Sequence, residues 1–442
     1  MLEVTMLQPF SAGRWSTMLP AGNIRFRSLS HVLLEVVNED LGKGATMGKP
    51  GIDVNNLPYA DGDFLAFESL LSDKERSRLA EIRTWLDAEV RPNAIGWWNE
   101  GVFPKGIIPK LAELDVVSPI RRQGYSNLFA GIVHSEFTRA DTSIATFMGV
   151  HDGLFTGSIE ALASKEQQEE WLPDIYSFRR IGAFGLTEPL GGSDVAGGTR
   201  TTARRDGGNW ILNGAKRWIG NATFSDWVVI YARDVEDNQV KGFMVDTTLP
   251  GYSATRIENK IALRSVENAD IVLDNVVVSD DFHLKGANSF RDTNKVLKVT
   301  RLSVGWQAVG QQMAAFDVAR RYAVERQQFG RPLASFQLVQ QQLVQILGNA
   351  MSSMGMMVRL SQLEDLGQAK DEHSALAKAF TTARMRESVA AGRNILGGNG
   401  IVTDYEMAKI FSDAEAIYSY EGTQEINTLV AGRAITGIAA FV

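Results

Sequence analysis

Apolar residues between positions 72 and 180 recur at helical spacing. Ser72 and Glu75 have the sequence of a capping box, in which each side chain satisfies a backbone amide at the start of a helix. The next apolar residues keep intervals of three and four up to a proline: Leu79, Ile82, Leu86, Val90 and Pro92. Similar patterns predict further helices over 104–114 and 128–139, and one that follows a second capping box at 164–167. This part of the chain is therefore predicted to be α-helical.

The pattern changes at about residue 181, where helical spacing gives way to short β-rich runs. Asn213-Gly214 separates two of these runs, 210–212 and 216–219. Because Asn-Gly supplies the positive φ angles of a tight turn, we expect a hairpin here. The runs continue at 227–232, 242–245 and 270–278. No helical pattern separates them, which predicts a small antiparallel sheet or barrel and argues against a Rossmann nucleotide site.

Helical spacing returns beyond residue 292. One segment keeps intervals of four and three that are typical of a helix in a bundle: Leu343, Leu347, Ala350, Met354 and Met357. The patterns together predict an α+β fold. We expect a flexible leader (1–60), an N-terminal α-helical domain (61–180), a middle antiparallel β domain (181–290) and a C-terminal four-helix bundle domain (291–442).

Composition narrows the chemistry. A chain of 442 residues that is 44% apolar can bury a large core, and its net charge of -7 argues against non-specific nucleic-acid binding, which needs a basic surface. The sequence has no cysteine, and its five histidines are scattered without an HExxH motif. We therefore predict no disulfide, no cysteine nucleophile and no metal site. An acid, a base or a bound cofactor remains to carry any reaction.

The first fifty residues and the lack of a long apolar run bear on the cellular location of the protein. Arg14, Arg25 and Arg27, with serines and few acids, faintly resemble a transit peptide, while Met47 offers an alternative start. No apolar run reaches the roughly 18 to 20 residues that span a bilayer. We expect a soluble protein in the cytoplasm, or in the mitochondrial matrix if the leader is a transit peptide.

Glu421 is the first candidate for chemistry, because it lies between Tyr420 and Gly422 near the start of a C-terminal helical segment. Partial desolvation by aromatic neighbours would raise the pKa of this carboxylate toward the range useful for proton abstraction. Gly422 would let a substrate approach the backbone. The alternative is a surface glutamate at a helix N-terminus, where the helix dipole favours negative charge.

Two glycine-rich stretches and one arginine are candidates for binding. Residues 184–194 (Phe-Gly-Leu-Thr-Glu-Pro-Leu-Gly-Gly-Ser-Asp) combine hydroxyls with accessible backbone amides, which suits a phosphate or the edge of a flavin, although such loops are also simple turns. Residues 396–400 (Leu-Gly-Gly-Asn-Gly) have the same ambiguity. Arg326, beside Phe329, suits a pyrophosphate or merely complements the end of a helix.

The order of these motifs resembles that of the acyl-CoA dehydrogenases. The motifs are 184–194, Lys-Arg-Trp-Ile at 216–219, Arg-x-Gln-Phe-Gly at 326–330, Leu-Gly-Gly-Asn-Gly at 396–400 and Tyr-Glu-Gly-Thr at 420–423. The resemblance covers about residues 72–441. Within the family, the chain is most similar to the branch of glutaryl-CoA dehydrogenase and the plant short-chain acyl-CoA oxidase, partly through residues 432–438.

The resemblance implies the family's fold, FAD as cofactor and a homotetramer. It implies that the following residues contact the flavin or its ribityl and phosphate parts within one subunit: Phe184, Leu186, Thr187, Ser193, Trp218, Ile219, Gly220, Thr423 and Glu425. It implies that a second set reaches the FAD of a neighbouring subunit: Arg326, Phe329, Gln337, Gly397 and Gly398. Ser193 is also expected to touch the CoA.

The implied reaction is the α,β-dehydrogenation of an acyl-CoA to the trans-2-enoyl-CoA. Glu421 would remove the α-proton, and donors aimed at the thioester oxygen would stabilise the developing enolate. Some family members place the base on the residue before an arginine that matches Arg301, but here that residue is Thr300. Arg301 is then left to support the CoA side of the site. A flavin-free relative that only binds acyl-CoA or protein is the non-enzymatic alternative.

Gly220 bears on the electron acceptor. It stands where many dehydrogenases have a threonine against the flavin, as in the plant oxidase. Losing the hydroxyl could admit oxygen, so the resemblance leaves two acceptors open: an electron-transfer flavoprotein for a dehydrogenase, or oxygen for an oxidase. The alternative is that Gly220 only reflects ancestry.

Ala145 and Thr146 bear on the substrate. They match the Arg-Ser pair that receives the distal carboxylate in glutaryl-CoA dehydrogenases. Since a buried carboxylate without a partner is costly, we expect a short, neutral acyl chain.

Overall fold

The computed structural model describes residues 57–440, so the predicted leader lies almost entirely outside the described residues. The first described domain is helical, as the spacing predicts. Both capping boxes are present: Ser72 with Glu75 begins α2, and Ser164 with Gln167 begins α9. The helices are α2 (Asp73–Glu89), α3 (Ala94–Glu100), α4 (Ile108–Leu114), α5 (Pro119–Gln123), α6 (Asn127–Ala140), α7 (Thr142–Met148), the π-helix η4 (Gly149–Thr156), α8 (Gly157–Leu162) and α9 (Lys165–Tyr176).

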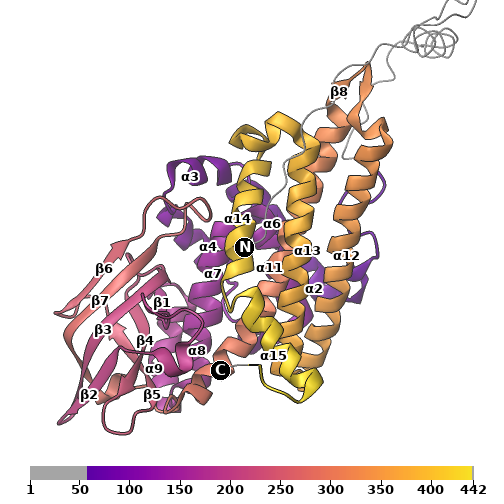
Figure 1. The fold of residues 1–442 in the computed structure, drawn as a ribbon. Coiled ribbons are helices and arrows are strands. Elements are labelled where there is room, and N and C mark those ends of the chain that lie inside the picture. Colours follow the sequence, from indigo (N-terminus) through magenta and orange to yellow (C-terminus); the bar gives the residue numbers. More distant parts are fainter. Residues whose placement is uncertain (1–56, 441–442) are drawn as a thin grey trace, which may run out of the picture. The chain divides into compact units, whose positions relative to one another are not determined.

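A seven-stranded sheet forms the middle domain (Figure 1). Its strands are β1 (Gly182–Gly185), β2 (Thr202–Asp206), β3 (Asn209–Gly220), β4 (Trp227–Asp234), β5 (Val240–Asp246), β6 (Tyr252–Arg256) and β7 (Asn268–Ser279), with the short helix α10 (Val195–Gly198) between β1 and β2. Most pairs are antiparallel, as expected. The expectation is wrong for β4, which pairs in parallel with β1 and with β2. Parallel pairs need a crossover connection, and the β2–β3 hairpin supplies it between β1 and β4.

The hairpin predicted at Asn213-Gly214 is also wrong. β3 runs unbroken through these residues and pairs with β7, with a register shift between Leu212 and Gly214. The turn lies earlier in the chain, at Gly207, where β2 reverses into β3. Gly214 does not form a turn. It allows the backbone to pass close to Thr201, because a Cβ at Gly214 would lie 2.6 Å from Cα of Thr201.

Long helices form the C-terminal domain, and α11, α12, α13 and α14 stand side by side in Figure 1. The elements are α11 (Phe290–Glu325), the hairpin β8 (Gln327–Gln328) and β9 (Arg331–Pro332), α12 (Gln337–Asp365), α13 (Asp371–Leu396), α14 (Met407–Ser419) and α15 (Gln424–Thr436). Ala350 and Met357 of the predicted apolar stripe are fully buried. Between residues 57 and 440, no helix combines the length and apolar character that crossing a membrane requires.

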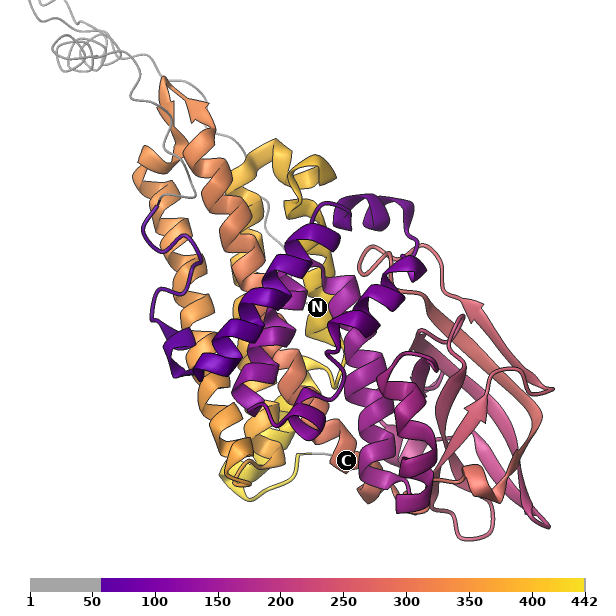
Figure 2. The same cartoon turned by 180° about the vertical axis from the view of Figure 1, so that it is seen from behind.

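Apolar contacts connect the domains. One cluster joins Phe129 and Phe147 of the N-terminal helices to Trp306 of α11. Another joins Trp171 of α9 to Phe184 at the end of β1, and Figure 2 shows α8 and α9, in magenta, beside the sheet. The sheet and the bundle are thus both fixed to the N-terminal helices, which brings the loop after β1, η4 and α11 toward one region.

Candidate active site

Glu421 lies in the tight loop between α14 and α15. Its φ is 54° and that of Gly422 is 80°, so two consecutive residues adopt the left-handed conformation. This conformation costs a non-glycine residue about 1 to 3 kcal/mol and persists only where neighbours fix it. A larger residue would not fit at position 422, because a Cβ there would also lie 2.9 Å from Nδ2 of Asn427. Thr423 then caps α15 by accepting a hydrogen bond from the Ile426 amide.

The carboxylate of Glu421 meets α11. Oγ1 of Thr300 donates a hydrogen bond to Oε2 of Glu421 at 2.8 Å. The residue before Arg301 thus contacts Glu421 directly, although its side chain cannot take up a proton. Thr300 therefore supports Glu421 instead of competing with it.

Burial and nearby cations act on Glu421 in opposite directions. Burial raises the pKa of this carboxyl, while the Thr300 hydrogen bond and the charges of Arg301 and Lys378 oppose the rise. Arg301 is itself buried and forms an ion pair with Asp371 at the start of α13. A desolvated carboxylate with a raised pKa is suited to proton abstraction near neutral pH.

The π-helix η4 faces the same part of α11. A Cβ at Gly153 would lie 3.7 Å from Cγ2 of Thr300, and one at Gly149 would lie 3.8 Å from Nε2 of Gln307. The Tyr420 hydroxyl in turn donates to Oε1 of Gln307. Two glycines one turn apart therefore face α11 near Glu421, and π-helical turns are frequent at functional sites.

Ala145 and Thr146 precede η4, and neither offers a charge. Ala145 is fully buried among apolar residues, and the Thr146 hydroxyl donates to the backbone oxygen of Thr142 at 2.7 Å. Of the two expected substrate contacts, Thr146 lies near Tyr420, and burial is the main cause that raises the pKa of Tyr420.

The loop after β1 carries the expected flavin contacts. Phe184 and Leu186 are buried, Thr187 is partly exposed and Ser193 is exposed. The Arg217 amide donates to the Thr187 oxygen at 2.9 Å, which fixes this loop against β3. The structure therefore brings Thr187 together with the strand that carries Trp218.

A buried ion pair holds this loop in place. Nζ of Lys216 lies 2.8 Å from Oε1 of Glu188, and it also donates to the Leu186 oxygen at 3.1 Å. Glu188 accepts from the amides of Arg200 and Thr201 at 2.7 and 2.9 Å. Burial lowers the pKa of Lys216 to about 8, against the opposing charge of Glu188. Both residues lie within sequence motifs, but the sequence alone assigns neither of them a role.

Trp218, Ile219 and Gly220 end β3. Trp218 has a φ of 65° and is 51% exposed, so its ring is available for stacking, whereas Ile219 is buried. Gly220 packs against η4, since a Cβ there would lie 3.1 Å from Cγ2 of Val150. The missing side chain therefore leaves no methyl-sized gap on the side of Val150.

The second set of predicted FAD residues lies at the other end of the bundle (Figure 1). Arg326 follows Thr300 by 26 residues along α11, roughly 39 Å at the helical rise of ~1.5 Å per residue. Arg326 and Gln337 are exposed, and Phe329 is 92% exposed. Gly397 and Gly398, which follow α13, are also exposed. Within one chain the structure does not bring this set to Glu421.

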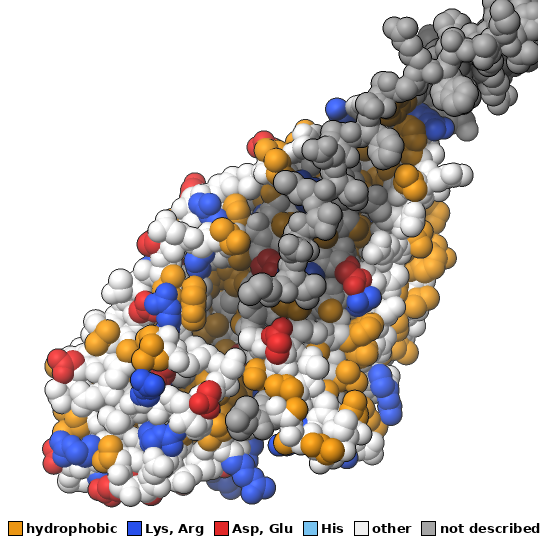
Figure 3. Space-filling view, viewed as in Figure 1, with side chains coloured by type: hydrophobic (Ala, Val, Ile, Leu, Met, Phe, Trp, Pro, Cys, Tyr) orange, Lys and Arg blue, Asp and Glu red, His pale blue; other side chains and the backbone are white. Residues whose placement is uncertain are grey.

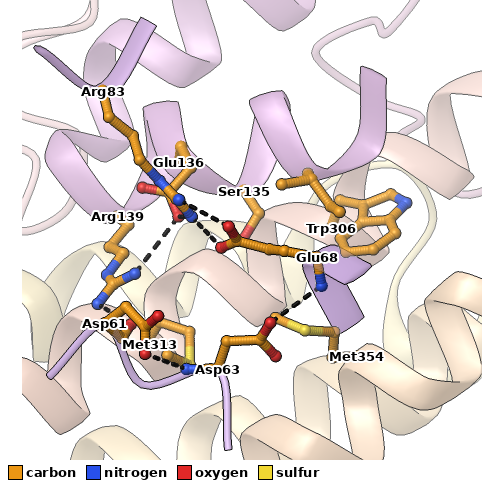
Figure 4. Close-up of a pocket in the computed structure, with 11 residues that line it drawn as sticks. Asp61, Asp63, Glu68, Arg83, Ser135, Glu136, Arg139, Trp306, Met313 and Met354 are labelled. Carbon is orange, nitrogen blue, oxygen red and sulfur yellow. Dashed lines mark hydrogen bonds and ion pairs between the residues drawn. The ribbon is translucent and has the colours of Figure 1, made fainter. Parts of the chain in front are cut away.

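A separate charged cluster is buried between α2, α6 and α11 (Figure 4). Arg83 lies 2.9 Å from Glu136, and Arg139 lies 2.6 Å from Asp317. Burial would raise the pKa of Glu136, but the charges of Arg139 and Arg83 outweigh it and lower the pKa to about 2. Because these charges pair with one another, the cluster is a structural tie between domains and not a second active site.

Side chains from several parts of the chain fit FAD. The side chains of Thr187 and Ser193 make no hydrogen bond within residues 57–440. The Trp218 ring is half exposed, and the guanidinium of Arg217 lies 5.1 Å from its centroid. Arg326 joins none of the ion pairs in the described part of the chain, so its guanidinium is open to a phosphate. Hydroxyls without a partner, an exposed aromatic ring and a desolvated carboxylate are compatible with an FAD-dependent oxidoreductase.

Comparison with known proteins agrees with this class. Family models match over all three domains: "Acyl-CoA dehydrogenase, N-terminal domain" at residues 72–179, "middle domain" at 183–276 and "C-terminal domain" at 290–436. The chain therefore belongs to the acyl-CoA dehydrogenase family, whose members bind FAD. The fold, family and cofactor implied by the sequence motifs are confirmed.

Several relatives cover most of the chain. Human mitochondrial short-chain specific acyl-CoA dehydrogenase is 30% identical over 369 residues, or 81% of this chain and 89% of that protein. The 3-(aryl)acrylate reductase of Clostridium sporogenes is 30% identical over 79% of this chain and 94% of its own length. A glutaryl-CoA dehydrogenase from Mycobacterium smegmatis, solved with FADH2, superimposes with a TM-score of 0.84 at 31% identity, covering 87% of this chain and 100% of that one.

Sequence reasoning missed Lys378 and Asn427, which contact the loop that carries Glu421. Nζ of Lys378 donates to the backbone oxygens of Tyr418 and Gly422. A signal was available, because Lys378 occupies the buried stripe of α13 at helical spacing with Ala375 and Met385. A lysine on a buried face needs an acceptor, but the sequence does not say which one.

Proposed function

We propose that this protein removes an α-proton and a β-hydride from a short, neutral acyl-CoA and releases the trans-2-enoyl-CoA. The observation that carries the proposal is Glu421, a desolvated carboxylate held by Thr300 where α11 meets the glycines of η4. The relatives named as short-chain specific and glutaryl-CoA dehydrogenases support the same reaction class.

In this proposal Glu421 takes the α-proton on a carboxylate oxygen. Thr300 keeps that carboxylate oriented, and Arg301 and Lys378 favour its ionised form before substrate binds. FAD, when bound, supplies the acceptor for the hydride that leaves the β-carbon. Thr187, Ser193, Trp218 and Ile219 would hold the flavin, while Thr423 and Glu425 are proposed for its polar part.

A neutral acyl chain is proposed from the residues that match the carboxylate-binding pair. Ala145 and Thr146 provide no cation, and Gln307 and Tyr420 beside η4 are neutral. A distal carboxylate placed there would lose its hydration without gaining a partner, at a cost of roughly several kcal/mol. Glutaryl-CoA is therefore expected to be a poor substrate.

The dehydrogenase is favoured over the oxidase by the contact at Gly220. Val150 of η4 fills the side on which a missing side chain could have admitted oxygen. An electron-transfer flavoprotein is therefore proposed as acceptor, with oxygen as the alternative.

We propose a soluble enzyme of the cytoplasm, or of the mitochondrial matrix if the first residues are a transit peptide.

A homotetramer is proposed because the two sets of FAD residues are far apart in one chain. Arg326, Phe329, Gln337, Gly397 and Gly398 would complete the site of a neighbouring subunit. Exposed apolar side chains along α12 and the β8–β9 hairpin support a contact there, including Leu338 at 72% and Val344 at 70% exposure (Figure 3).

Anaerobic titration of the FAD-loaded protein with acyl-CoAs tests the proposal. Short, unbranched and neutral acyl-CoAs should bleach the flavin, and Glu421→Gln should abolish bleaching while retaining FAD. Admission of oxygen afterwards reports the acceptor, with slow reoxidation over minutes expected for a dehydrogenase. Bleaching of the Glu421→Gln protein at the unmodified rate would remove Glu421 as the base.

A further inference from the structure

Lys378 is a fully buried lysine that forms no ion pair with a described carboxylate. Its Nζ donates instead to two backbone oxygens, that of Tyr418 at 2.8 Å and that of Gly422 at 2.7 Å. Burying a cation without an opposite charge is costly. Two neutral acceptors do not compensate for the loss of hydration as a carboxylate would, so the position of this lysine needs another explanation.

The two acceptors lie on either side of Glu421. Tyr418 is in the last turn of α14, where carbonyls lack helical partners and the helix dipole is negative. Gly422 directly follows the base. One ammonium group therefore connects the end of α14 with the far side of the loop and closes the loop around Glu421.

A second residue completes this support without a charge. Nδ2 of Asn427 donates to the backbone oxygens of Gly422 at 2.9 Å and Thr423 at 3.1 Å, and it lies 3.3 Å from that of Glu421. Lys378 from α13 and Asn427 from α15 together account for the left-handed backbone at Glu421 and Gly422, which needs external fixation.

The charge of Lys378 also reaches the carboxylate of Glu421. The groups that face Glu421 are Thr300 and Arg301 of α11, Lys378 of α13 and Tyr420 of its own loop. Arg301 is already paired with Asp371. Lys378 bonds only neutral oxygens, and the carboxylates that act on its charge are those of Glu421 and Glu425.

We propose that Lys378 is the positioning residue of the base: it holds residues 418–422 in the turn that aims the Glu421 carboxylate, and its charge keeps that carboxylate ionised at lower pH. The inference rests on the proposed function, in which Glu421 abstracts the proton. Neither the family models nor the names of the relatives assign a role to this lysine.

The test uses the full chain loaded with FAD and compares two variants. Lys378→Met removes the charge and the donors from an unbranched side chain, whereas Asn427→Leu removes only donors. Lys378→Met should lower kcat on the order of 10- to 100-fold, as small displacements of a catalytic group do, with little change in KM. It should also move the acid limb of the kcat/KM profile to higher pH, because the ionised form of Glu421 loses a nearby cation.

Asn427→Leu should lower kcat and leave the acid limb in place, and the exposed Lys295→Met on α11 should change neither quantity. A normal acid limb in Lys378→Met would overturn the proposal, and so would a normal kcat. If Lys378→Met does not retain FAD, Lys378→Gln replaces it, since Gln keeps two N–H donors without a charge. Lys378→Gln should shift the acid limb with a smaller loss of kcat, and an unshifted limb would again overturn the proposal.

Glu421→Gln separates this inference from the proposed function. If Glu421→Gln is active, the proposed base is wrong whatever Lys378 does. If Glu421→Gln is inactive while Lys378→Met behaves as the unmodified enzyme, the base stands and only the role of Lys378 is lost.

Discussion

Thr300 donates a hydrogen bond of 2.8 Å from Oγ1 to Oε2 of Glu421. The residues lie 121 positions apart in sequence, on α11 and on the loop between α14 and α15. The resemblance drawn from the sequence implies these two positions as alternatives for a base, and in this fold they face each other. Here one supplies the carboxylate and the other supplies a donor that stabilises its charged form.

Replacing Thr300 by valine should therefore make the base harder to ionise. Valine has the same shape but no donor, so the pKa of Glu421 rises and the acid limb of the kcat/KM profile moves to higher pH. Because a hydrogen bond to a charged group is worth about 1.5 to 3 kcal/mol, kcat/KM on the acid side should fall about tenfold. Thr293→Val, a buried threonine on the same helix, is the matched control. An acid limb at the same pH in Thr300→Val and the unmodified enzyme would contradict the prediction.

Gly220→Ala tests whether the glycine serves packing or oxygen access. The added methyl would lie 3.1 Å from Cγ2 of Val150, so it should overpack this contact and lower stability by about 1 kcal/mol. Combining it with Val150→Ala should recover most of the loss, as thermal unfolding would show. Stopped-flow reoxidation by oxygen should take minutes in both the unmodified and the Gly220→Ala protein. Rapid reoxidation that Gly220→Ala slows would favour the oxidase instead.

Arg326→Ala tests whether the distant residues bind the cofactor of another subunit. Loss of a guanidinium–phosphate contact should weaken FAD retention at least tenfold, measured as the ratio of flavin to protein absorbance after gel filtration. The acid limb set by Glu421 should not move, because Arg326 is proposed to contact a phosphate of FAD and not the Glu421 carboxylate. Arg359→Ala, an exposed arginine on α12, is the control. Full FAD retention by Arg326→Ala would remove it from the cofactor site.

Local signals allowed much of the fold to be predicted. Both capping boxes and the apolar stripes placed α2, α9 and α12, because helix starts and amphipathic faces depend on residues close in sequence. The hairpin prediction at Asn213-Gly214 was wrong because the conformation there depends on packing against Thr201, which is distant in sequence, and not on the turn preference of the dipeptide. The parallel pairing of β4 was missed for the same reason, since partner strands are chosen by tertiary packing.

The candidate site shows the same limit. Glu421 and Thr187 could be identified from motifs, but the residues that hold the Glu421 loop in place could not. Lys378 and Asn427 act on backbone oxygens, which every residue possesses, so no partner residue marks them in the sequence. The contact of Val150 with Gly220 depends on the fit between η4 and β3. Contacts of this kind cannot be predicted from the sequence, because one partner is a backbone atom or a glycine and its residue type does not indicate the contact.

Asp152 of η4 should make stability depend on pH. Its Oδ1 accepts a hydrogen bond from the Ser118 amide at 2.8 Å. Burial raises the pKa of Asp152 to about 7; the nearby Glu160 adds to the rise, while Ser118 and Arg122 oppose it. The folded state therefore binds this proton more tightly than the unfolded state, in which the pKa is about 4. The resulting stabilisation is complete below about pH 4 and is lost as pH rises through 7.

Asp152→Asn should accordingly be more stable than the unmodified protein at pH 8 and gain much less at pH 5. Asparagine keeps an oxygen acceptor for the Ser118 amide but never carries the buried charge, so the variant avoids the cost that ionisation imposes above pH 7. Thermal unfolding of both proteins at the two pH values measures this difference. Asp206→Asn, at the exposed end of β2, should give no pH-dependent change. A shift in melting temperature of equal size at pH 5 and pH 8 would show that Asp152 is already ionised in the folded protein at pH 5, because only a group that titrates between these values can make the two shifts differ.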